Sequence, residues 1–198
     1  MEKVEHVIGA ILIIIGVILN NKEVSTVWKK VLRNFLPHDS AIREQIKSIM
    51  DNLRSEIGAV RVNLWMFNNG ITSEGGYSYK YASIVFETFS DDLKPIKKTF
   101  SNIPVEDYLS FLSRLRESNK YLTSDKNCSD PIIRGMFSVI SMEYGIDFKL
   151  SDKNVYRGFV SVCFGHDINT EHEQQIIKKI EAAAAIINSK IKTMKRIN

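Results

Sequence analysis

The sequence predicts an α+β fold: an antiparallel sheet of about five to six strands, with N- and C-terminal helices packed on one face, preceded by an N-terminal hydrophobic helix. Two observations predict it. Apolar residues recur every three or four positions near both ends of the chain, and they alternate with period two in between. The length of 198 residues allows one ordinary domain and a short appendage. We divide the chain into a hydrophobic anchor helix (1–21), an amphipathic stalk helix (22–38) and one globular domain (39–198).

The N-terminal run VIGAILIIIGVIL, residues 7–19, is uncharged and apolar on every side of a helix. Its roughly 20 Å of helix fall short of a hydrocarbon core of about 30 Å, and extension over residues 4–21 reaches spanning length. No cleavable signal peptide pattern is present. We therefore expect a single-pass membrane protein anchored through residues 4–21. The alternative is a helix buried in an oligomer or a larger assembly.

Positive charge follows this run rather than preceding it. Because cytoplasmic flanks are rich in Lys and Arg, the bias predicts that the C-terminal domain lies in the cytoplasm. The residues on which this rests are Lys22, Lys29, Lys30 and Arg33.

Three amphipathic helices are predicted outside the sheet. The stalk helix ends at Pro37. A second helix begins at Asp39 or Ser40 and stops at Gly58. The last spans about Thr170 to Met194, with Thr170 and Glu173 as a capping box. The two long helices that flank the body are expected to pair with each other.

The region between these helices is predicted to contain both strands and helices. We predict strands over 60–67 and 77–89, helices over 91–100 and 105–117, a short strand over 121–124 and a helix over 130–144. Residues 146–150 and 156–164 are expected to form a hairpin across the polar turn SDKN.

Several of these stretches resemble the GAF domain family. They are RVNLWMFNNG, YASIVFETF, the SNIP turn before VEDYLSFL, and YRGFVSVCFG, and the resemblance covers about Ala41 to Lys195. It implies a cytoplasmic sensory or regulatory fold that commonly binds a cyclic nucleotide, a tetrapyrrole or an amino-acid metabolite between the sheet and its crossing loops. The terminal helices of such domains often form a dimer. Asn68 stands where one group of the family has histidine, which puts any metal-binding or proton-transfer role of that position in doubt.

The candidate ligand-binding residues gather around the end of the first strand. Two amides and several aromatic rings at a strand end could stack on and hydrogen-bond a flat polar ligand. Three of the tyrosines have spacing two, which places them on one face of a single predicted strand. An arginine near a helix N-terminus could meet an anion. The full set is Phe67, Asn68, Asn69, Tyr77, Tyr79, Tyr81 and Arg134.

Each of these residues also has a purely structural interpretation. Asn-Asn-Gly can simply end a strand, because these residues tolerate positive φ. The tyrosines can form a packed ladder, and Arg134 can pair with a surface carboxylate. Glu87, inside an apolar strand, must face solvent or have a partner such as Arg61.

The sequence gives little support to other functions. The net charge of +4 comes without a basic stripe carrying interleaved aromatic residues, so no nucleic-acid binding is expected. His166, Asp167, His172 and Glu173 match no established metal spacing. No hydrolase, nucleotide-binding or metalloprotease motif occurs, and we expect no enzyme. GAF-like reductases of free methionine sulfoxide use cysteines, and here only Cys128, expected in an exposed polar loop, would suit.

The function predicted from these observations is a membrane-anchored, cytoplasmic, non-enzymatic sensor for an unidentified small ligand, acting as a homodimer through its terminal helices. The sequence indicates no particular cofactor. The alternative is a structural or assembly scaffold, of possible viral or mobile-element origin, that uses the fold to oligomerise. A sensor predicts a concavity lined by Phe67, Asn68, Tyr79 and Tyr81, whereas a scaffold predicts a filled core there.

Overall fold

The computed structural model describes residues 37–68, 71–73, 76–152 and 155–194. It divides the chain into two compact units, residues 1–44 and 45–198. The second unit carries the sheet. The predicted anchor (1–21) and nearly all of the predicted stalk (22–38) lie outside the described residues. Among the helices that the structure describes, none combines the length and apolar character needed to cross a membrane.

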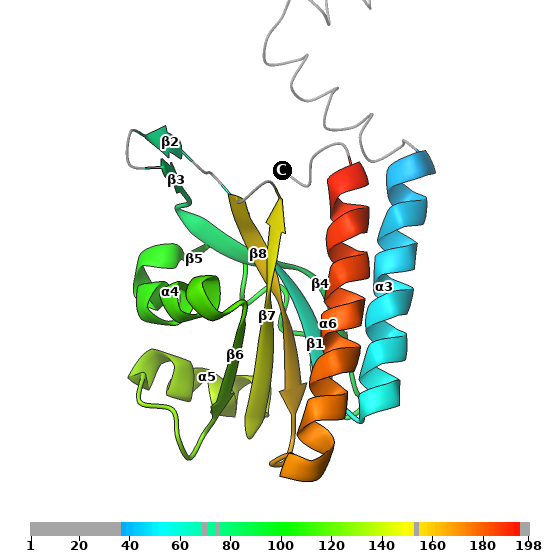
Figure 1. The fold of residues 1–198 in the computed structure, drawn as a ribbon, viewed down its shortest axis with the longest axis vertical. Helices are drawn as coiled ribbons and strands as arrows, with labels where there is room; N and C mark the ends of the chain where they lie inside the picture. The colour runs from blue at the N-terminus through cyan, green and yellow to red at the C-terminus, as the bar shows by residue number, and fades with distance from the viewer. Residues whose placement is uncertain (1–36, 69–70, 74–75, 153–154, 195–198) are drawn as a thin grey trace, which may run out of the picture. The chain divides into compact units, whose positions relative to one another are not determined.

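A six-stranded antiparallel sheet forms the centre of the second unit, in the order β5-β4-β1-β8-β7-β6 (Figure 1). This confirms the predicted sheet. A separate two-stranded ribbon, β2-β3, extends from it. The strands are β1 Arg61–Asn68, β2 Ile71–Ser73, β3 Gly76–Ser78, β4 Tyr81–Phe89, β5 Ile103–Pro104, β6 Lys120–Ser124, β7 Tyr144–Asp152 and β8 Val155–Phe164.

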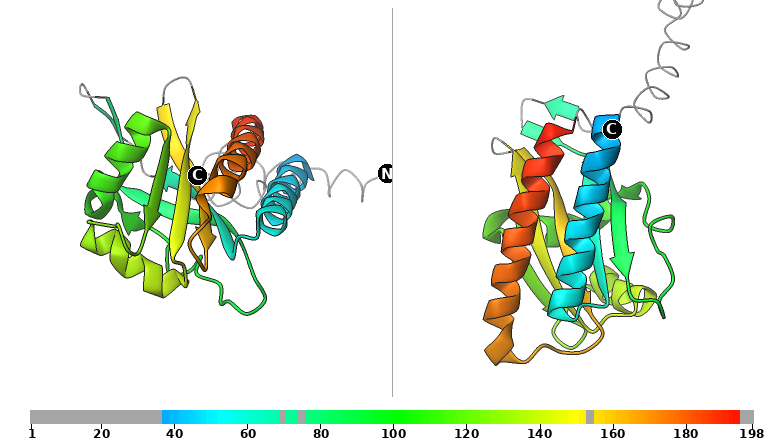
Figure 2. Two further views of the ribbon diagram at one scale, coloured as in Figure 1. Left: turned by 60° about the horizontal axis from the view of Figure 1, so that its bottom comes forward. Right: turned by 90° about the vertical axis from the view of Figure 1, so that its right-hand side faces the viewer.

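Helices cover both faces of the sheet (Figure 2). Helix α6 (Thr170–Thr193) and the part of α3 (Pro37–Ile57) from Gln45 onward lie on one face, as predicted for the terminal helices. They run antiparallel, because Lys190 Nζ lies 2.7 Å from Gln45 Oε1 and Lys179 Nζ lies 2.9 Å from Glu56 Oε1. The 3-10 turn η1 (Val105–Tyr108) and helices α4 (Leu109–Ser118) and α5 (Pro131–Ile140) cover the other face.

Strand β1 lies at the middle of the sheet, and this explains its long apolar run. All its residues from Arg61 to Phe67 are buried, because helices lie over both faces. Trp65 and Phe67 join the core under α4 and α5. By alternation, Leu64 and Met66 point to the face that α3 and α6 cover.

Two predicted elements are wrong. Residues 91–100 form turns instead of a helix, since Pro95 in the middle of the segment cannot donate a helical hydrogen bond. Residues 77–89 are not one strand, because β3 ends at Ser78 and β4 begins at Tyr81. The three tyrosines at 77, 79 and 81 therefore do not share one strand face.

Helix ends differ from prediction in smaller ways. Helix α3 begins at Pro37, which is favoured in a first helical turn, and Gly58 ends it with φ +67° as predicted. Helix α5 stops at Ile140 because Ser141 turns left-handed, at φ 55°. Helix α6 is capped by Asn169, whose side chain accepts from Glu171 N, instead of by the predicted Thr170 capping box.

Candidate functional site

A cavity of about 50 Å³ lies between the sheet and the layer formed by η1, α4 and α5. Since one water needs roughly 10–15 Å³ by this measure, the space holds a few waters or a very small ligand. Most of its wall is apolar, from residues such as Trp65, Ile96, Tyr108, Phe111, Ile133 and Phe159. These come from the two central strands, the turns of residues 91–100, η1, α4 and α5.

Four polar side chains form the sheet side of the cavity. Asn63 of β1 pairs with Ser161 of β8, and Ser161 pairs with Asp147 of β7. Directly paired residues of antiparallel strands point to the same face, so these three form a row across the sheet. Thr123 of β6 pairs with Gly145, two residues before Asp147, and so lies on the same face diagonally from Asp147. We call Asn63, Thr123, Asp147 and Ser161 the polar row.

The polar row is buried and incompletely paired. Asn63 and Thr123 are 1% and 2% exposed, and within the described part of the chain Asn63 Oδ1 and Thr123 Oγ1 have no hydrogen-bond partner. Such unpaired buried atoms are rare in folded proteins, because each costs roughly 1–3 kcal/mol. They are the feature of this cavity that most needs a partner.

Asp147 carries the one carboxyl group among the described residues that line the cavity, and that lining includes no Lys, Arg or His. Burial raises the pKa of Asp147 to about 7, against the opposing effect of a hydrogen bond with Ser161. A carboxylate removed from water without a cation nearby is costly, so its neutral form is favoured until a positive partner arrives.

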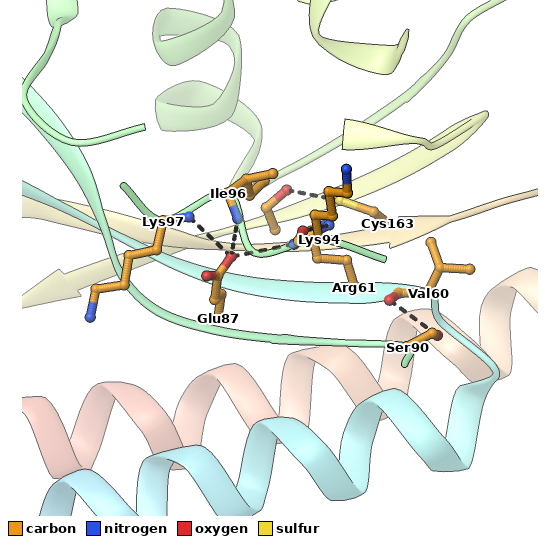
Figure 3. A network of polar contacts seen from close by, with 9 residues as sticks. Val60, Arg61, Glu87, Ser90, Lys94, Ile96, Lys97 and Cys163 are labelled. Carbon is orange, nitrogen blue, oxygen red and sulfur yellow. Dashed lines mark hydrogen bonds and ion pairs between the residues drawn. The ribbon is translucent and has the colours of Figure 1, made fainter. Parts of the chain in front are cut away.

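A buried ion pair holds the loop that contributes Ile96 to the cavity lining, and Figure 3 shows its polar contacts. Arg61 Nη1 lies 3.3 Å from Glu87 Oε2, which confirms the predicted partner of Glu87. The same carboxylate oxygen accepts from the backbone N–H groups of Ile96 (2.9 Å) and Lys97 (3.1 Å). Arg61 also donates to the carbonyl of Lys94 at 2.8 Å. These bonds hold the loop that follows β4 on the sheet and place Ile96 at the cavity.

The predicted ligand-binding residues lie elsewhere in the structure. Phe67 is buried, with its ring stacked on that of Tyr79 (centroids 5.0 Å apart) and edge-on to that of Tyr156 (4.8 Å). Asn68 Nδ2 donates to Asn102 Oδ1 at 3.0 Å and to Ser83 Oγ at 3.3 Å. Asn68 Oδ1 has no partner among the described residues.

Tyr81 begins β4 opposite Asn68, and Asn69 lies outside the described residues, as does the side chain of Tyr77. None of Phe67, Asn68, Tyr79, Tyr81 and Arg134 lines the cavity. The rings of Phe67 and Tyr79 stack on each other and thus fill the space between these two residues. A ligand contact by any of this set stays a prediction.

Arg134 has a structural role that the sequence did not indicate. Its Nε donates to the carbonyl oxygen of Cys128 at 3.0 Å, and its Nη2 donates to the same oxygen. Asp130 caps α5 by accepting from Ile132 N and Ile133 N. The loop is thereby folded inward, and Cys128 is 2% exposed. The expectation of an exposed Cys128 is therefore wrong.

Two of the four metal-competent side chains near the start of α6, Asp167 and Glu173, are engaged in other contacts. Asp167 forms an ion pair with Lys126, and Glu173 accepts from Tyr144 Oη at 2.8 Å. Across residues 37–68, 71–73, 76–152 and 155–194, no group of three or more His, Cys, Asp or Glu side chains is arranged to hold a metal ion.

Sequence reasoning missed the polar row. Its members sit at alternate positions of apolar strands, as in VNLWMF, IDFKL and VSVCF, and a polar residue there ordinarily indicates a solvent-facing side. The available signal was the strand order: β1, β8 and β7 are neighbours, and both faces of their centre are covered by helices.

The fold is that of GAF domains. The blue-light absorbing form of the PixJ GAF domain of Thermosynechococcus elongatus superimposes with a TM-score of 0.57 at 9% identity, over 78% of this chain and 89% of that one. The phycocyanobilin-bound GAF domain of a cyanobacterial phytochrome gives 0.58 at 11% identity, over 85% and 93%.

A third structure, the chromophore-binding domain of a bacteriophytochrome from R. palustris, gives a TM-score of 0.58 at 10% identity, over 80% of this chain and 60% of that one. No family model and no curated protein sequence matches the chain. At these identities the likeness establishes the fold and leaves the ligand open.

Proposed function

We propose that this protein is a non-enzymatic sensory module of GAF fold that binds a small ligand in the cavity beneath α4 and α5. One observation carries the proposal: a largely apolar cavity bears four buried polar side chains, two of which have an oxygen without a partner among the described residues. Largely apolar pockets with a few convergent polar groups are typical ligand sites. GAF domains that hold phycocyanobilin lend support at the level of the fold.

The ligand is smaller than a tetrapyrrole. Pockets for drug-sized molecules commonly measure roughly 300–1,000 Å³. The cavity here measures about 50 Å³, and its walls include the packed side chains Trp65, Phe111 and Phe159. A tetrapyrrole would therefore require α4 and α5 to move away from the sheet.

The test compares compounds bound to the full-length protein with those bound to a variant whose cavity is filled. Ala82 lines the cavity, so Ala82→Leu is expected to occupy it. Ser113→Leu, on the exposed side of α4, is the matched control. Mass spectrometry of compounds released on denaturation should find a molecule with the wild type and the control that is missing from Ala82→Leu. No such molecule, together with higher stability of Ala82→Leu, would contradict the proposal and favour the scaffold.

Membrane anchoring through residues 4–21, with the C-terminal domain in the cytoplasm, is part of the same proposal. Its support is the apolar run VIGAILIIIGVIL and the positive residues that follow it. Cell fractionation of the full chain and of a chain lacking residues 1–21 tests it. We expect the full chain in the membrane fraction and the shortened chain, still folded, in the soluble fraction. Aggregation of the shortened chain would instead indicate that the run belongs to a protein core.

Association of two copies through α3 and α6 is also proposed. The Ala-rich run of α6 is divided: Ala183 and Ala184 are buried within the protomer, whereas Ala182 and Ala185 are exposed. Ile186 beside them is 49% exposed, and large exposed apolar side chains on a helix often mark contacts. Ile186→Lys should therefore shift the molecular mass measured by light scattering from dimer to monomer, while an unchanged mass would count against this interface.

A further inference from the structure

The cavity presents one carboxyl group and two oxygens that have no hydrogen-bond partner among the described residues. Asp147, 5% exposed, is the one carboxyl of its described lining, and no cationic side chain opposes it. The nearby cationic side chains contact other groups. Arg61 pairs with Glu87 and donates to the carbonyl of Lys94. Lys149, two residues along β7 from Asp147, donates to the carbonyl of Arg116 at 2.8 Å. A positive charge for Asp147 must therefore come from outside the described chain.

The unpaired atoms of the polar row require hydrogen-bond donors. Asn63 Oδ1 is an acceptor and Thr123 Oγ1 can accept, while Ser161 already forms a hydrogen bond with Asp147. Asn63 and Asp147 both flank Ser161 in the row. A ligand with several N–H groups on one charged centre would satisfy these oxygens together.

The apolar wall suits a cation that carries a small hydrocarbon part. Its aromatic members are Trp65, Tyr108, Phe111 and Phe159. Aromatic rings attract cations through their negative faces and at the same time cover apolar groups. An anion would meet no positive group in this lining, and a neutral apolar molecule would leave the polar row unpaired.

We propose that the cavity binds a small organic cation, an ammonium or amidinium group on a few carbon atoms, with its charge against Asp147 and its N–H groups donating to Asn63 and Thr123. The proposal rests on the proposed function and names the class of its ligand.

Binding should depend on pH because Asp147 must be ionised to pair with a cation. Its pKa of about 7 predicts an affinity that increases as pH rises to about 7 and falls roughly tenfold per unit below it. The other titratable groups near it stay in one charge state over this range. Burial raises the pKa of Cys163 to about 12 and raises the pKa of Tyr108 and Tyr156 above the usual tyrosine value.

The other side chains around Asp147 come from α4, β6 and α5. The charge of Arg116 of α4 opposes the rise in the pKa of Tyr156, and Tyr121 of β6 lies opposite Asp147 in the sheet. Helix α5 contributes only apolar side chains to the cavity, Ile133, Met136 and Ile140. Among the described residues, only burial and the hydrogen bond with Ser161 shift the pKa of Asp147, so the pH dependence reports this carboxyl.

The experiment uses ethylammonium chloride as the probe, with ethanol as its neutral analogue and sodium acetate as an anion of similar size. The best efficiencies known for very small ligands put a three-atom probe near millimolar affinity, so saturation-transfer NMR on the full-length protein is suitable. We expect ethylammonium to bind near pH 8 and ethanol and acetate not to. Asp147→Asn should weaken binding at least tenfold and remove its pH dependence.

Two variants separate a binding role from a structural one. Thr123→Val is expected to weaken ethylammonium binding while the protein remains folded, because it deletes one acceptor and keeps the shape. Asp92→Asn, in the exposed turn after β4, is the control and should bind as the wild type does.

The outcomes distinguish the ligand class from the proposed function. Binding of ethanol or acetate as strong as that of ethylammonium would contradict the proposal that the ligand is a cation, and so would unchanged binding by Asp147→Asn. In both cases the cavity would still be a ligand-binding site. If none of the three probes binds, the proposal that the ligand is a cation is contradicted as well. The proposed function itself fails when, in addition, no compound is released from the wild type and ordered waters fill the cavity.

Discussion

The guanidinium of Arg61 and the carboxylate of Glu87 form an ion pair with almost no access to water, 3.3 Å between Nη1 and Oε2 at side-chain exposures of 2% and 9%. The pair connects the central strand β1 to β4, and Glu87 also accepts from two backbone amides of the following loop. Burial lowers the pKa of Arg61, and the charge of Glu87 works against that change. The pair thus adds side-chain hydrogen bonds to a loop whose own backbone bonds include those from Leu93 N to Ser90 O and from Phe100 N to Ile96 O.

Glu87→Ala is expected to destabilise the fold by roughly 3–5 kcal/mol, because it leaves a buried guanidinium without its carboxylate. It should also speed hydrogen exchange at the amides of Ile96 and Lys97. Urea unfolding and exchange measured by NMR check both. Lys126→Ala, which removes an exposed ion pair with Asp167, is the control and should leave the unfolding midpoint almost unchanged. Equal effects of the two substitutions would show that Arg61 finds another partner.

Replacement of two buried threonines by valine is expected to change the stability of the fold in opposite directions. Thr123 Oγ1 has no partner among the described residues, whereas Thr88 Oγ1 donates to Asp51 Oδ1 of α3. Because Val has the shape of Thr without the hydroxyl, Thr123→Val should stabilise the fold by about 1 kcal/mol and Thr88→Val should destabilise it by a similar amount. The measurement is the free energy of unfolding in urea. A loss of stability in Thr123→Val would show that a bound water or ligand pairs with its hydroxyl.

Much of this architecture could be predicted from the sequence because its signals are local. The hairpin of β7 and β8 follows from alternation around SDKN, and the end of α3 follows from Gly58. The polar row could not be predicted, because it depends on which strands are neighbours. Asn63 and Asp147 are separated by 84 positions and meet only through Ser161 of the strand between them.

The predicted ligand residues show the same limit. Aromatic rings at Phe67 and Tyr79 were expected to be near each other, and they are, but they stack on one another. A sequence pattern indicates that residues share a region, whereas only the register and the break after β3 decide whether their rings enclose space or fill it. The helix predicted over 91–100 failed because Pro95 was given too little weight.

Two glycines provide a matched test of packing. A Cβ on Gly158 of β8 would lie 2.1 Å from the carbonyl oxygen of Trp65, whereas a Cβ on Gly135 of α5 meets nothing within 4 Å. We therefore expect Gly158→Ala to destabilise the fold by roughly 1–3 kcal/mol or more and to change the fluorescence of Trp65 at the cavity. Gly135→Ala should stabilise it by about 1 kcal/mol, since Ala favours a helix interior. A tolerated Gly158→Ala would mean that β1 and β8 can separate without cost.

The buried carboxyl of Asp147 predicts how stability depends on pH. Its pKa is about 7 in the folded protein against an ordinary value of 3.8, so between these values the folded state holds a proton that the unfolded state has released. The free energy of unfolding therefore decreases as pH rises from about 4 to about 7, by a total on the order of 4 kcal/mol, and the loss is constant above that range.

Asp147→Asn has no such proton to lose. Its stability should match that of the wild type near pH 4 and exceed it increasingly up to about pH 7, and taking the difference removes the contribution of all other titrating groups. Urea unfolding of both proteins across this range measures it. Ethylammonium at about 100 times its dissociation constant should reduce this difference near pH 8 by roughly 2.7 kcal/mol, because a bound cation stabilises only the ionised Asp147 of the wild type. A difference independent of pH would show that Asp147 is already ionised and paired in the folded protein.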